Sequence, residues 1–194
     1  DKPVVFEKSR GWTAHIETLE AVLTQEAKIL VPVRDIRDIL ASFEKIWRKD
    51  SGLNIIPQER GNMGKFGTVE SRSDVWMKSN QPVGTAYNNI KDAVVRGHAN
   101  RMHFVFFEKL TTEPKKVMQE IYHFLGEPYF EHDFDNVEQT THENDRMHGF
   151  TDLHTIRRKV APVSSQWKKI LGNFAEKYDK LNFWQKSLHI NKTK

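Results

Sequence analysis

The chain has 194 residues, enough for one domain with a sizeable core and too few for two. Hydrophobic residues make up 38% of it, and its 12 Phe and 5 Trp exclude a disordered chain. The lack of cysteine excludes disulfides and thiolate metal sites, and fits a cytoplasmic protein. No apolar stretch reaches the roughly 18 residues of a membrane span. The net charge of +4 suits a small polyanionic ligand and is too diffuse to indicate nucleic acid.

Three short apolar runs predict buried strands, at residues 3–6, 29–33 and 103–107. Their hydrophobicity is continuous rather than alternating, which is typical of a parallel sheet covered on both faces. Helical patterns are expected over residues 12–23, 36–47, 82–98, 114–125 and 174–181. This order of elements predicts an α/β domain with three layers and a doubly wound, mostly parallel sheet.

In such sheets, ligands bind in the crevice beyond the carboxyl ends of the strands. The residues that follow the three predicted strands are Glu7, Lys8 and Ser9, then Arg34, then Glu108. Two cations, Lys8 and Arg34, therefore lie beside the expected crevice, which indicates an anionic ligand.

The segment VRDIRDILASFEKIW (residues 33–47) resembles the 3′-phosphate-binding motif of the sulfotransferases that use 3′-phosphoadenosine 5′-phosphosulfate (PAPS). In that P-loop-type family, a strand ends in Arg and a Ser follows eight residues on, as Arg34 and Ser42 do here. A guanidinium binds a phosphate bidentately, and a hydroxyl adds a neutral donor. The resemblance implies that Arg34 and Ser42 bind the 3′-phosphate.

Three further segments carry the resemblance. EKSRGW (residues 7–12) is similar to a strand end with a Lys near the transferred group, which implies that Lys8 is catalytic. FFEKLTTEP…FLGEP (residues 106–128) places Phe107 where the family often has a Tyr against the adenine. HTIRRKV (residues 154–160) occupies the place of a basic loop that binds the cofactor phosphate; Arg157 is the first candidate and Arg158 or Lys159 the next.

The resemblance covers nearly the whole chain and is closest to the bacterial and phage-like branch. One family feature is missing: the Gly/Ser/Thr-rich phosphosulfate loop with a Lys after the first strand. GNMGKFG (residues 61–67) lacks Walker A spacing, has Phe66 in place of Ser or Thr and follows no predicted strand, so we interpret it as a flexible loop. The chain begins at Asp1, and we expect the phosphosulfate loop to precede it.

We expect one sulfotransferase-like domain over residues 1–194. Within it, residues 1–49 form a core with the 3′-phosphate motif, 50–81 form a mobile excursion with few apolar residues, 82–128 form a helix–strand–helix unit, and 129–194 carry the cofactor loop and the C-terminal region.

The polar stretch of residues 131–148 contains side chains that could bind zinc or manganese: His132, Asp133, Asp135, His142, Glu143, Asp145 and His148. No His pair there has the i, i+4 spacing of a helical metal site, so we interpret the stretch as solvated surface and expect no metal. Candidates for a general base, by residue type only, are Glu7, His15, His142 and His154. Arg10 stands where the family's cytosolic branch has its catalytic His, and Arg cannot act as a base.

The resemblance implies transfer of a sulfuryl group from PAPS, with release of 3′-phosphoadenosine 5′-phosphate (PAP), to a hydroxyl or amine. The acceptor stays open among small molecules, carbohydrates, lipids and peptides, and the oligomeric state is not indicated. Two alternatives stay open as well. A P-loop kinase would need a Mg²⁺-binding Asp at a strand end, and a polyanion-binding module would need a basic stripe with exposed aromatics.

Overall fold

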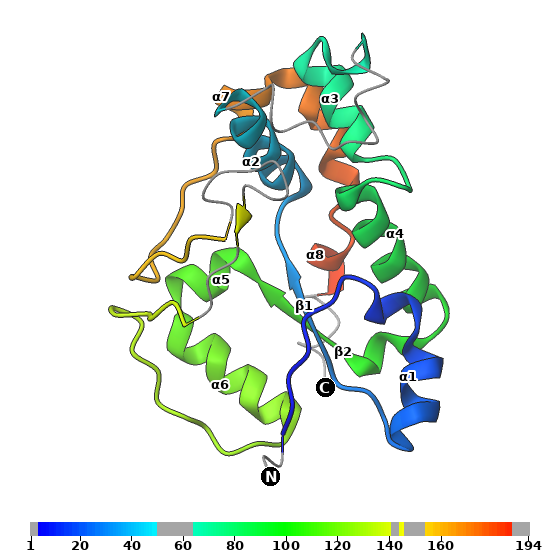
Figure 1. Cartoon of the computed structure of the whole chain (residues 1–194), viewed down its shortest axis with the longest axis vertical. Helices are drawn as coiled ribbons and strands as arrows, with labels where there is room; N and C mark the ends of the chain where they lie inside the picture. The colour runs from blue at the N-terminus through cyan, green and yellow to red at the C-terminus, as the bar shows by residue number, and fades with distance from the viewer. Residues whose placement is uncertain (1–3, 50–63, 141–143, 146–153, 188–194) are drawn as a thin grey trace.

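The structure is a computed structural model, and it describes residues 4–49, 64–140, 144–145 and 154–187. Within these residues two parallel strands, β1 (Ile29–Val33) and β2 (Met102–Phe106), form the sheet. Their register runs from Ile29 opposite Met102 to Val33 opposite Phe106. Helices lie on both sides of the pair (Figure 1). The chain is therefore α/β with a small parallel sheet, and the strands predicted at 29–33 and 103–107 are confirmed.

The helices are η1 (Trp12–Ala14), α1 (Ile16–Leu23), α2 (Ile36–Lys49), α3 (Val69–Trp76), α4 (Pro82–Val95), η3 (His98–Arg101), α5 (Phe107–Thr112), α6 (Pro114–Leu125), α7 (Trp167–Leu171), η5 (Asn173–Leu181) and α8 (Trp184–Ser187). Helices occupy each of the five predicted stretches, and the structure adds α3, α5, α7 and α8, which were not predicted. Helix α6 has a clear sequence signal at each end: Pro114 begins it, and Gly126 ends it in a left-handed conformation with φ of 73°. Among the described residues, no helix is long and apolar enough to cross a membrane.

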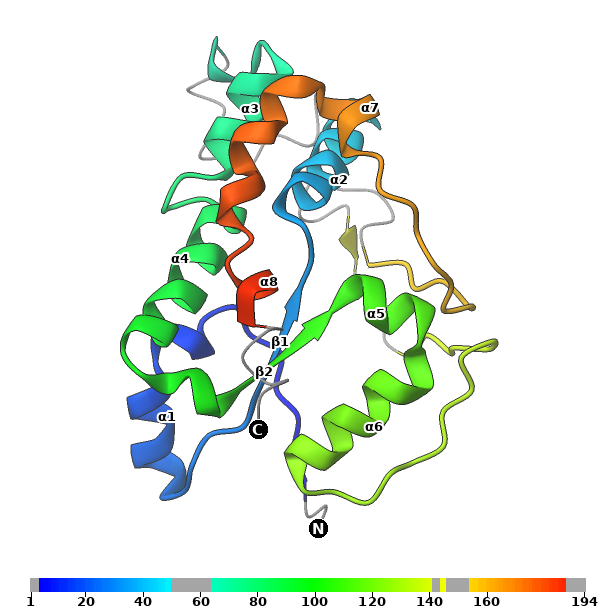
Figure 2. The same cartoon turned by 180° about the vertical axis from the view of Figure 1, so that it is seen from behind.

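The two strands are covered on both faces, as their continuous hydrophobicity predicted. Val31, Val33 and Met102 belong to the main core, which they share with residues of α2, α4 and the C-terminal segment. Val105 points the other way and packs with Val117 and Ile121 of α6. Figure 2 shows the same arrangement from behind, with α6 on one side of the strands and α1 and α4 on the other.

The strand predicted at residues 3–6 is not present among the described residues of that run. Residues 4–6 have no regular secondary structure, and Val5 and Phe6 are 85% and 70% exposed. An apolar run forms a strand only where a neighbouring strand pairs with its backbone, and no described strand lies beside this one.

The mobile excursion predicted over residues 50–81 is wrong for its second half, while residues 50–63 lie outside the described residues. Residues 69–76 form α3, whose first turn is closed by a capping box between Thr68 and Ser71. Ser73 and Arg72 are buried in this helix together with Val75 and Trp76. Two of the four buried side chains of α3 are polar, so the sequence of this helix shows little of the apolar periodicity from which a helix is predicted.

A buried ion pair connects α3 to α2. Glu44 is fully buried, and its two carboxylate oxygens accept hydrogen bonds from Nη2 and Nε of Arg72, each at 2.8 Å. The Arg72 guanidinium also donates to the Phe66 carbonyl at 2.6 Å and lies 3.8 Å from the Trp47 ring centroid. Arg48 adds an exposed contact to Glu44 at 2.6 Å. Each buried charge is thus matched by an opposite charge or a hydrogen bond, as burial requires.

Removing one member of this pair should be costly. Glu44→Ala leaves the Arg72 guanidinium buried without its carboxylate, so we expect the free energy of unfolding to fall by about 3–5 kcal/mol. Arg48→Ala removes only the exposed partner and should cost less than about 1 kcal/mol. Urea denaturation of the two variants measures the difference, and equal losses would contradict the assigned roles.

His103 gives the fold a pH dependence. Its ring stacks on Phe124 of α6 with centroids 5.2 Å apart, and this burial lowers the pKa of His103 below its ordinary value despite the nearby Glu120. In the unfolded chain His103 takes up a proton near pH 6.5, whereas in the folded chain it does so only at a lower pH. The stability that depends on neutral His103 is therefore complete above pH 6.5 and is lost as the pH falls below that value. His103→Phe should flatten the decline in unfolding free energy between neutral and mildly acidic pH. The same slope in wild type and variant would rule out His103 as its source.

Candidate active site

An open pocket of about 710 Å³ lies where β1 and β2 end. Arg34 reaches it from the end of β1, Phe107 and Leu110 from α5, and Met118 from α6. The opposite wall comes from two irregular segments, residues 130–138 and 157–163. The pocket therefore lies at the carboxyl edge of the parallel strands, where the sequence placed a ligand crevice.

The strand register brings Arg34 and Phe107 together. Val33 and Phe106 are the last paired residues, so the next residue of each strand leaves the sheet at the same edge. The Arg34 guanidinium lies 4.4 Å from the centroid of the Phe107 ring, which is a cation–π contact. Its Nε is buried and has no hydrogen-bond partner among the described residues. The ring thus contacts the guanidinium, and the buried Nε donor is left unsatisfied by the described residues.

The opposite wall is a ribbon of two crossing segments. The Val137 N–H donates to the Arg158 carbonyl at 2.6 Å, and the Val160 N–H donates to the Phe134 carbonyl at 2.8 Å. Arg157 and Lys159 line the pocket, whereas Arg158 does not and donates to the Asn136 side chain instead.

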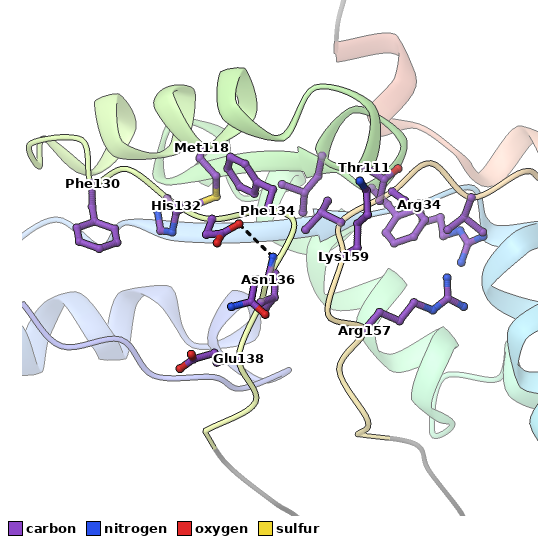
Figure 3. A pocket seen from close by; sticks show the side chains of 17 residues that line it. Arg34, Thr111, Met118, Phe130, His132, Phe134, Asn136, Glu138, Arg157 and Lys159 are labelled. Carbon is purple, nitrogen blue, oxygen red and sulfur yellow. Dashed lines mark hydrogen bonds between the residues drawn. The ribbon is translucent and has the colours of Figure 1, made fainter.

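The cations of the pocket differ in their partners. Lys159 forms an exposed ion pair with Asp135 at 2.6 Å, and this hydrogen bond raises the pKa of the Lys159 amine. Arg157 makes no hydrogen bond or ion pair with a described residue. Figure 3 shows Arg34 and Arg157 at one end of the pocket. That end carries positive charge that the described residues leave largely uncompensated.

The other end of the pocket is aromatic. Figure 3 places Phe130 and His132 there, with Met118 and Phe134 between this end and the cations. The His132 ring is 5.2 Å from Phe130 and 5.9 Å from Phe134, and its Nε2 lies 3.2 Å from the Tyr122 hydroxyl. The interpretation of residues 131–148 as solvated surface is therefore wrong for His132, which packs between rings.

The sequence pattern did not predict that residues 130–138 form a wall of the pocket. The available signal was the recurrence of large apolar residues, Phe130, Phe134 and Val137, within a polar stretch. Asp133 supplies the turn chemistry between them, because its carboxylate accepts from the backbone N–H groups of Asp135 and Asn136 at 3.0 and 3.1 Å.

Two candidate residues do not reach the pocket. Ser42 is exposed on α2, about 9 Å along the helix axis from its first residue at 1.5 Å per residue, and does not line the pocket. Lys8 is exposed in the irregular segment before η1 and does not line the pocket either.

The candidates for a general base are dispersed. Glu7 accepts a hydrogen bond from the Trp12 indole, and His15 precedes α1. His154 contacts the Asp145 carboxylate through Nδ1, and its backbone N–H donates to the same carboxylate at 3.0 Å. His142 lies outside the described residues. The described residues contain no group of three or more His, Asp or Glu that could hold a metal ion.

Comparison with known proteins connects this geometry to a family. The family model for the sulfotransferase domain matches residues 12–187. The chain belongs to the sulfotransferase family. This match includes Arg34, Phe107 and the whole ribbon of the opposite wall, whereas Lys8 lies outside it.

Two curated relatives are similar over part of their length. Sulfotransferase 1A1 of Bos taurus is 22% identical over 142 residues, and sulfotransferase 1A1 of Rattus norvegicus is 22% identical over 146 residues. Each alignment covers 73% of this chain and 45% of the relative, so the chain spans less than half the length of the curated relatives it matches. No solved structure matches the chain.

The Arg34–Phe107 contact should be measurable. Phe107→Leu keeps an apolar side chain but removes the ring face below the guanidinium. In a double-mutant cycle with Arg34→Ala, urea denaturation should give a coupling of about 0.5–1 kcal/mol. Phe107→Tyr retains the ring and should keep the coupling. A coupling near zero with Phe107→Leu would show that the two groups do not interact.

Proposed function

We propose that this chain carries the donor site of a PAPS-dependent sulfotransferase, which transfers a sulfuryl group from PAPS to a hydroxyl or amine. The observation that carries the proposal is the partly buried Arg34 guanidinium at the carboxyl edge of the parallel strands, in a pocket that it shares with Arg157 and Lys159. Family membership supports the same chemistry. The donor supplies an activated sulfuryl group, and the residues of this chain bind and orient it.

The charged end of the pocket fits a phosphate. Arg34 has a buried Nε without a partner, and a buried donor of this kind is stabilised by a ligand that accepts from it. Arg157 has no described partner, and Lys159 can exchange the exposed Asp135 carboxylate for a ligand oxygen at little cost. These three residues would hold the 3′-phosphate of the donor.

The remainder of the pocket fits the uncharged part of a nucleotide. Apolar side chains dominate it, including Leu110, Phe134 and Val160, and Phe107 lies under Arg34. A heterocyclic base is planar and apolar on its faces, so it gains from contact with such side chains. The structure gives no comparable place for Ser42, and the role of that residue in phosphate binding stays a prediction.

Other features of the function also stay predictions: the catalytic role of Lys8, the phosphosulfate loop, the likeness to the bacterial and phage branch, a cytoplasmic location, and an acceptor among small molecules, carbohydrates and lipids. A doubly wound, three-layer sheet belongs to the same proposal, since helices flank both faces of the two described strands.

The decisive residue for this proposal is Arg34. A charge-assisted hydrogen bond contributes about 1.5–3 kcal/mol, so Arg34→Ala should weaken PAP binding by roughly one to two orders of magnitude. Arg34→Lys should restore part of the affinity, because an ammonium lacks the planar fork of a guanidinium. Isothermal titration calorimetry with PAP measures each dissociation constant.

The control ligand is adenosine 5′-phosphate, which lacks the 3′-phosphate. It should bind wild type more weakly than PAP does, and Arg34→Ala should leave its affinity nearly unchanged. Equal weakening of both ligands in a folded variant would show that Arg34 does not recognise the 3′-phosphate.

A further inference from the structure

The turn that carries Arg34 is held from a distant part of the chain. The Ile36 N–H, two residues after Arg34, donates to Oδ1 of Asn182 at 2.9 Å, and Asn182 is only 4% exposed. Ile36 is the first residue of α2, so this N–H has no partner within its own helix. Asn182, which lies 146 positions after Ile36 in the sequence, therefore caps the N-terminus of α2.

Two more contacts join the first turn of α2 to the C-terminal segment, residues 166–182. Asp38 is buried, and its carboxylate accepts from the backbone N–H groups of Gln166 and Trp167 at 3.1 and 3.2 Å. Arg37 reaches Asp179 at 2.8 Å and lies 4.5 Å from the Trp167 ring centroid. Arg37 is fixed at its other side by Asp35.

The Asp35 carboxylate remains ionised in this arrangement. Burial opposes its charge, but hydrogen bonds from the guanidinium and backbone N–H of Arg37 outweigh burial and hold the pKa of Asp35 below its ordinary value. Residues 35–38 are thus each tied by a side chain or a backbone group, whereas the Arg34 guanidinium contacts the Phe107 ring and its Nε has no hydrogen-bond partner among the described residues. The direction of Arg34 therefore depends on the backbone that Asn182 fixes.

We infer that Asn182 is a positioning residue for Arg34: it holds the first turn of α2 so that the guanidinium points into the pocket. This inference rests on the proposed function, because it assigns Arg34 to the 3′-phosphate. Neither the family match nor the sequence pattern singles out Asn182 for this role. A small displacement of a binding group weakens a charge-assisted contact strongly, since such contacts depend on distance and angle.

Asn182→Ala should weaken PAP binding about tenfold and leave the binding of adenosine 5′-phosphate within about twofold of wild type. Asp179→Ala removes the exposed ion pair with Arg37, which also joins the first turn of α2 to the C-terminal segment. This variant should therefore fold, and it should weaken PAP binding about two- to fivefold. All titrations are made well below the thermal midpoint of each variant.

A matched control separates positioning from general stability. Tyr178 lies in η5 close to Asn182 in sequence, and its hydroxyl donates to Asp74 of α3 rather than to a residue of the turn. Tyr178→Phe should lower the thermal midpoint and leave the dissociation constant of PAP within about twofold of wild type. In the Arg34→Ala background, Asn182→Ala should have less than a twofold further effect.

The outcomes are distinct. If wild type binds PAP no better than adenosine 5′-phosphate, the proposed function fails and this inference fails with it. If wild type prefers PAP but Asn182→Ala and Asp179→Ala both bind PAP as wild type does, the inference alone is overturned. It is also overturned if Tyr178→Phe weakens PAP binding as much as Asn182→Ala, or if the effect of Asn182→Ala persists without Arg34.

Discussion

The parallel register of β1 and β2 is the constraint on which the candidate site depends. Because Val33 pairs with Phe106, Arg34 and Phe107 leave the sheet side by side at its carboxyl edge. The register is fixed by burial on both faces: a shift of one residue would turn the side chains of the main core toward α6 and those facing α6 into the main core. The position of the guanidinium is thus a consequence of core packing.

Helix α2 connects this edge to the rest of the molecule. Its first turn carries the contacts to the C-terminal segment, and its later turns contain Glu44, which is paired with Arg72 in the interior. Arg34 therefore lies in a turn between β1 and a helix that is anchored along its length, as precise binding groups require. The facing wall is held differently, by two backbone hydrogen bonds and the exposed pair of Lys159 with Asp135. Exposed pairs contribute little to stability, so this wall can adapt to a ligand more easily than the Arg34 side.

The sequence revealed the parts of the fold that local pattern determines. Continuous apolar runs identified β1 and β2, and periodicity with Pro114 and Gly126 identified α6. Helix α3 was hidden, because Arg72 is buried by a charge partner 28 positions away, which no local pattern encodes. Arg34 could be selected because it follows a strand. The resemblance also selected Arg157 and Lys159, but residues 134–137 could not be assigned to the pocket, because they meet residues 158–160 only in the folded chain.

The distribution of charge gives the pocket a direction. Arg34 and Arg157 lie at one end, whereas Glu138 lies toward the aromatic end with His132 (Figure 3). A carboxylate repels a phosphate, and a partly buried guanidinium whose Nε has no hydrogen-bond partner among the described residues attracts it. A ligand with one charged and one planar apolar end is therefore oriented by electrostatics before any specific contact forms. Under the proposed function, the phosphate of the donor would lie at Arg34, and its apolar end would extend toward Phe134 and Phe130.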